Sequence, residues 1–64
     1  MKVFIREAIK KGITTAQLAE KIGVTPQAIY DWKLGKSTPS PVHLKALAEV
    51  LEVETDKLID DFHF

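Results

Sequence analysis

The chain contains no cysteine, and none of its apolar runs exceeds three residues. Without cysteine there is neither a disulfide framework nor a thiolate metal site, so the core must be held by packing alone. Runs this short exclude membrane-spanning and secretory segments. We therefore expect a soluble, cytoplasmic protein.

Sixty-four residues are enough for one small core, and 45% of them are hydrophobic and 28% charged. That composition is typical of a globular protein and excludes a disordered tail. A chain of this length buries only about 60% of its unfolded surface, which disfavours an active-site cleft between two layers. We expect a single domain over residues 1–64.

The formal net charge is zero, but the charges are unevenly placed. Residues 1–12 carry four basic side chains and one glutamate, whereas residues 37–64 carry six carboxylates and two lysines. This distribution favours a dipolar molecule with a basic half that faces phosphate and an acidic half that faces water or a partner. Chance fluctuation along a short chain is the alternative.

Glycine and proline divide the chain into intervals of about ten residues, as expected for short helices joined by turns. Apolar spacing and capping residues predict helices over about 2–11, 15–22, 26–34 and 41–51, and a last short helix from Glu54 or Thr55. No segment alternates with a period of two. The predicted fold class is therefore all-α, a compact bundle of five short helices.

The second and third helices are separated by only Gly23-Val24-Thr25, which forces a steep crossing at close range. Ala19 is small enough to allow that approach, Gly23 makes the turn, and Ile29 and Trp32 anchor the following helix. These offsets satisfy the steric requirements of a helix-turn-helix at 15–34, whose second helix enters a DNA major groove. If Trp32 were exposed instead, its indole could stack on a single-stranded base.

The segment from Ile13 to Lys36 resembles the Cro/CI-type (XRE) helix-turn-helix of phage repressors and bacterial regulators. Pro39-Ser40, the run from Leu44 to Leu51, Val53 and Leu58 extend the resemblance to about residues 4–60. It implies a lambda repressor-like fold and operator binding, usually as a dimer. The chain departs from the family pattern at Ala8, Thr15 and Lys33, where Arg, Gln and Glu are frequent, so the operator sequence does not follow from the resemblance.

On the third helix, the face opposite Ile29 and Trp32 is expected to meet the bases. Gln27 resembles the base-reading glutamine of the family, and its amide suits adenine. Ala28 suits a thymine methyl, and Asp31 either accepts a hydrogen bond from cytosine or orients the Gln27 amide. The candidate base-reading residues are Pro26, Gln27, Ala28, Tyr30 and Asp31, and the candidate DNA-backbone residues are Thr15, Lys33, Lys36, Ser37 and Thr38.

The sequence disfavours catalysis and metal binding. His43 and His63 are twenty residues apart, and the adjacent Asp60 and Asp61 point in different directions on a helix. No Gly-rich phosphate loop is found. We expect no enzyme activity, no cofactor, no metal and no small-molecule ligand.

The predicted function is sequence-specific binding of double-stranded DNA by a small, nucleoid-associated transcriptional regulator, most simply a repressor. A homodimer would read a pseudo-palindromic operator. Ile59, Phe62 and Phe64 are the tentative dimer surface, with folding back onto the core as the alternative. The rival function is a protein-interaction module, such as an antitoxin or anti-repressor, that uses the acidic C-terminal half.

Overall fold

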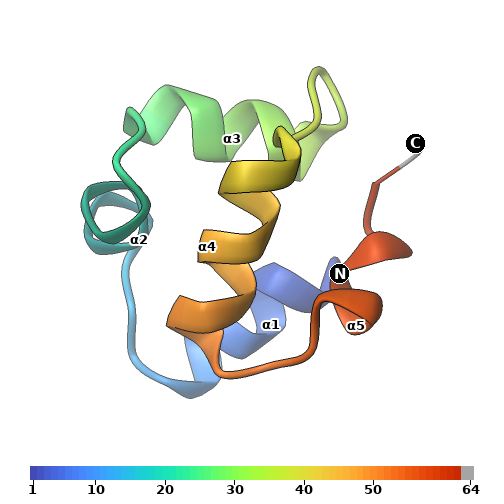
Figure 1. The fold of residues 1–64 in the computed structure, drawn as a ribbon. Coiled ribbons are helices and arrows are strands. Elements are labelled where there is room, and N and C mark those ends of the chain that lie inside the picture. Colours follow the sequence, from blue (N-terminus) through green and yellow to red (C-terminus); the bar gives the residue numbers. More distant parts are fainter. Residues whose placement is uncertain (63–64) are drawn as a thin grey trace.

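A computed structural model describes residues 1–62, and these residues form five helices and no strand (Figure 1). The helices are α1 (Val3–Lys10), α2 (Thr15–Ile22), α3 (Pro26–Leu34), α4 (Pro41–Leu51) and α5 (Thr55–Ile59). The predicted all-α class and five-helix bundle are confirmed. α2, α3 and α4 have the predicted bounds, whereas α1 is one residue shorter at each end. None of the described helices is long and apolar enough to cross a membrane.

Three helices begin at a hydroxyl cap. Thr14, Thr25 and Ser40 each accept a hydrogen bond from the backbone N–H three residues later, at 3.1, 3.3 and 3.4 Å. Proline follows at the first helical position of α3 and α4, where its missing N–H costs nothing. These caps explain why the starts of α2, α3 and α4 can be read from the sequence.

Helix ends are made by residues in the left-handed conformation. Gly23 ends α2 with φ 89°, and Gly35 ends α3 with φ 78°. α4 ends differently, because the residue in this conformation is Glu52, with φ 58°. Among the described residues it is the only non-glycine with positive φ. A side chain with a Cβ is disfavoured there, so the turn into α5 carries backbone strain.

The core is built around α4, which lies in the middle of the bundle and packs against α1, α2 and α5 (Figure 1). α3 packs against α2. The buried apolar side chains come from all five helices and from the segment after α5, and they are Phe4, Ala8, Leu18, Ala19, Ile29, Trp32, Leu44, Leu47, Ala48, Leu51, Leu58 and Phe62. Each described helix therefore contributes at least one buried side chain to a single small core.

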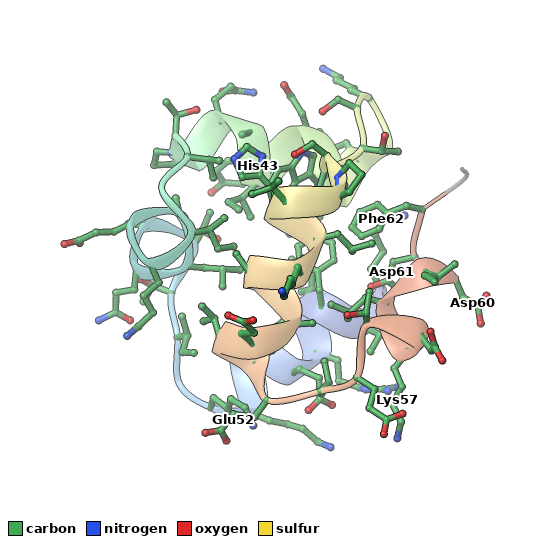
Figure 2. All side chains as sticks on the ribbon, viewed as in Figure 1. His43, Glu52, Lys57, Asp60, Asp61 and Phe62 are labelled. Atoms are coloured by element: carbon green, nitrogen blue, oxygen red, sulfur yellow. The ribbon has the colours of Figure 1, made fainter. Side chains whose placement is uncertain are left out.

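The residues that follow α5 return to the start of α1. The Asp61 carboxylate accepts hydrogen bonds from the Val3 N–H at 2.7 Å and the Phe4 N–H at 2.8 Å. The Lys2 ammonium donates to the Asp61 carbonyl and lies over the Phe62 ring. We call Asp61 and Phe62 the C-terminal clasp (Figure 2). Lys2, the residue before α1, makes no side-chain cap. The Asp61 carboxylate takes over this role and pairs the free N–H groups at the start of the helix.

The clasp decides between the two alternatives for Phe62. The tentative assignment to a dimer surface is corrected, and folding back onto the core is what occurs, because α5 ends at Ile59 and Phe62 is 5% exposed. Its ring stacks on Phe4 with centroids 5.5 Å apart, so its apolar area is buried within the chain. Of the other two residues, Ile59 is 42% exposed, and Phe64 lies outside the described residues.

Candidate nucleic-acid interface

The junction of α2 and α3 depends on a small residue and a left-handed turn. Ala19 is 1% exposed, and its carbonyl accepts hydrogen bonds from the Gly23 N–H at 2.8 Å and the Val24 N–H at 3.0 Å. The two bonds close the end of α2 and turn the chain within three residues. α2 and α3 therefore pack against each other at the junction that the sequence spacing predicts.

Two side chains anchor α3 to the rest of the molecule. Ile29 is 1% exposed and Trp32 4% exposed, and the indole also meets the His43 ring, with centroids 6.1 Å apart. Because Trp32 is buried, it is not available to stack on a single-stranded base. The opposite face of α3 is exposed to solvent at Gln27, Tyr30 and Leu34, and α3 lies along the top of the bundle in Figure 1.

The candidate base-reading residues lie together on α3. Gln27 is exposed and donates a hydrogen bond from its amide Nε2 to Asp31 Oδ1 at 3.0 Å. This contact agrees with the reading in which Asp31 orients the glutamine. Pro26 and Tyr30 are exposed, whereas Ala28 and Asp31 are half-buried. The Gln27 carbonyl and its second amide hydrogen are not used in this bond, so both functions that adenine requires are available.

The candidate backbone-contacting residues lie at the start of α2 and around the end of α3. Thr15 is half-buried at the first position of α2, and Lys33, Lys36, Ser37 and Thr38 are exposed. The loop after α3 is fixed to the helix, because the Lys36 and Ser37 N–H groups donate to the Asp31 carbonyl at 2.8 and 3.4 Å. The loop side chains are therefore presented from a defined position at the end of α3.

Two residues near the interface were missed by sequence reasoning. Gln17 completes a capping box, since its Oε1 accepts the Thr14 N–H at 3.0 Å, and the spacing Thr14-x-x-Gln17 is the signal for it. Leu34 is 63% exposed on α3, and its offsets from Gln27 and Tyr30 place it on the same helical face.

The described residues contain no group of three or more histidine, cysteine or carboxylate side chains able to hold a metal ion. His43 is half-buried beside Trp32, and His63 lies outside the described range.

A sequence model of a helix-turn-helix family matches residues 5–58. The chain belongs to the XRE-type helix-turn-helix family. Membership in this family makes it a DNA-binding protein that acts on double-stranded DNA. The searches of curated proteins and of solved structures gave no match.

Within this XRE-type domain the match covers all of α2, α3 and α4 and runs from α1 to Leu58 in α5. The clasp residues Asp61 and Phe62 lie beyond the match. The cap on α1 is therefore a feature of this chain outside the matched family segment.

Proposed function

We propose that this XRE-type protein is a sequence-specific transcriptional regulator, acting as a repressor, and that α3 enters the major groove of its operator. The observation that supports this most directly is Gln27, an exposed amide on the free face of α3 that is held by Asp31 at 3.0 Å. A side chain oriented before docking loses less conformational entropy on binding, which favours a specific contact.

Gln27 reads adenine, donating to N7 and accepting from the N6 amino group. Asp31 orients the amide and presents its other carboxylate oxygen to the groove. Ala28 approaches a thymine methyl, and Pro26 and Tyr30 border the contact. This assignment gives α3 one bidentate contact bordered by apolar and aromatic side chains.

DNA-backbone contacts come from Thr15 at the start of α2 and from Lys33, Lys36, Ser37 and Thr38 around the end of α3. They fix the position of the protein without reading sequence. Because they come from two elements, α2 and the end of α3, they fix the orientation of α3 on the DNA.

The protein binds as a homodimer to a pseudo-palindromic operator whose half-sites lie one helical turn, roughly 34 Å, apart. With Phe62 in the core, Ile59 is the remaining described member of the expected dimer surface. The chain acts as one domain and works at the nucleoid in the cytoplasm, where its operator is found.

Duplex affinity at two salt concentrations tests the proposal. A groove binder loses affinity as salt rises, with a log–log slope of about −0.9 for each phosphate neutralised. Selection of bound sites from random duplexes then reports whether binding is sequence-specific and whether half-sites are symmetric. An affinity that is equal for all selected and unselected duplexes would contradict the proposal.

A second candidate is a protein-interaction module such as an antitoxin or anti-repressor. The exposed carboxylates Glu52, Glu54, Asp56 and Asp60 around α5, together with zero net charge, favour it. A protein of this class would select no operator from random duplexes, so the same selection experiment separates the two functions.

A further inference from the structure

The free face of α3 carries a continuous stripe of four residues at helical spacing. Gln27, Tyr30, Asp31 and Leu34 follow one another at i, i+3, i+4 and i+7, which places them on one side of the helix. Its polar members are Gln27 and Asp31. Its large apolar members are Tyr30, which is 48% exposed, and Leu34, which is 63% exposed and lies at the end of the stripe.

Leu34 has no evident role in the core. α3 contributes Ile29 and Trp32 to the buried cluster, and Leu34 is absent from that cluster and from the partly buried residues packed against it. A single exposed leucine is common on protein surfaces. This one continues the stripe, one turn after Tyr30 and directly after the Gln27–Asp31 pair.

The charges around the stripe indicate what kind of partner surface the stripe would contact. No member of the stripe is cationic, whereas Lys33 and Lys36 are exposed beside its apolar end. Apolar side chains bordered by cations match a DNA groove, in which base edges form the floor and phosphates form the rims. In the major groove the apolar group is the C5-methyl of thymine. The commonest specific contact to guanine uses Arg or Lys, which this stripe lacks.

We infer that Leu34, with Tyr30 beside it, is a specificity-determining residue that reads thymine through its C5-methyl group. Seven residues of helix correspond to about 10 Å, or about three base pairs from the adenine that Gln27 reads. Each half-site is therefore a short run rich in A·T pairs. This inference rests on the proposed function and adds the base that the far end of α3 recognises.

Replacing thymine by deoxyuridine tests the inference, because it removes only the methyl group. Starting from a duplex selected by the wild-type protein, each thymine of a half-site is exchanged in turn, and affinities are measured for wild type and Leu34→Ala. We expect the wild type to lose about fourfold at the position that Leu34 reaches, the effect of one buried methyl group. Leu34→Ala should bind the thymine and uracil duplexes equally at that position.

Ile9→Ala is the matched control. Ile9 is an aliphatic residue on α1 with 64% exposure, close to that of Leu34, and it lies outside the stripe. This variant should keep the wild-type ratio of thymine to uracil affinity at every position. Since Leu34 is exposed and alanine is a good helix former, the helical circular dichroism of Leu34→Ala should match that of the wild type.

The inference is overturned if uracil has no effect on the wild type, or if Leu34→Ala shows the wild-type ratio at every position. In either case selective binding of the duplex remains, and the proposed function stands. A wild-type protein that selects no duplex overturns both.

Discussion

The Gln27 amide already has one hydrogen engaged in the structure, because Asp31 accepts it at 3.0 Å. The pair lies one helical turn apart on α3, where side chains four residues apart meet. The same contact fixes which amide atom is presented as acceptor. In the proposed complex, recognition of the base by Gln27 would therefore depend on both residues.

Replacing Gln27 by alanine should cost about 1–3 kcal/mol of binding free energy at one operator position and leave discrimination at the others unchanged. The reason is loss of one bidentate base contact. Affinities for duplexes with single substitutions would measure it. An equal loss on every duplex would assign Gln27 to the DNA backbone instead.

Glu52 is the residue at which backbone strain is stored, since its φ is 58° at the end of α4. Glu52→Gly should raise the free energy of unfolding by about 1 kcal/mol, because glycine adopts this conformation without a Cβ penalty. Urea denaturation measures the change.

Glu52→Ala is the control for this prediction. It removes the exposed ion pair with Lys11, at 3.8 Å, but keeps the Cβ. It should give no such gain in stability. Equal stabilisation by glycine and alanine would show that the side chain, and not the backbone conformation, sets the effect.

At the scale of the element, α1 differs from the other long helices in the origin of its cap. α2, α3 and α4 are capped by the residue before them, whereas α1 is capped by the Asp61 carboxylate, which receives the Val3 and Phe4 N–H groups. The stability of α1 therefore depends on the far end of the sequence.

Asp61→Ala should lower the free energy of unfolding by about 2–3 kcal/mol, because it removes two hydrogen bonds to a charged, buried acceptor. Asp60→Ala is the matched control: Asp60 is the exposed neighbour, and its change should stay within about 0.5 kcal/mol. Thermal or urea unfolding of both variants gives the comparison. A similar effect of the two substitutions would exclude the cap as the cause.

The difference between local caps and the long-range cap on α1 also explains which parts of the fold can be predicted from sequence. Thr14, Thr25 and Ser40 mark helix starts by local hydrogen bonds, so a linear reading finds them. Asp61 acts across a separation of 57 residues, and Phe62 reaches the core through the same return of the chain, so no local pattern reports either. At the candidate interface, the apolar spacing of α3 predicts which face of the helix is exposed. The Gln27–Asp31 hydrogen bond does not follow from spacing alone, because Asp31 could equally have been free to accept a hydrogen bond from cytosine.

At the scale of the whole molecule, zero net charge does not prevent a polyanionic partner, because the charges are separated along the chain. Lys33 and Lys36 are exposed at the end of α3, whereas exposed carboxylates gather around α5. The molecule can therefore orient itself in the field of DNA before contact is made.

Lys36→Ala should weaken binding to all duplexes alike and make the salt dependence shallower by about one unit of log–log slope. The reason is that one phosphate contact fewer releases fewer counterions. Titrations at several salt concentrations measure the slope. A loss confined to particular sequences would instead give Lys36 a base-reading role.

The C-terminal clasp has a consequence for how the protein is made. α1 is synthesised before the other four described helices, but its buried cap and the ring that covers Phe4 belong to residues synthesised 57 or 58 positions later. A nascent chain halted at Ile59 would have the sequence of every helix and yet leave the first one open to water. Synthesis of the five helices is therefore not enough to close α1, which becomes capped and covered only after Asp61 and Phe62 have emerged.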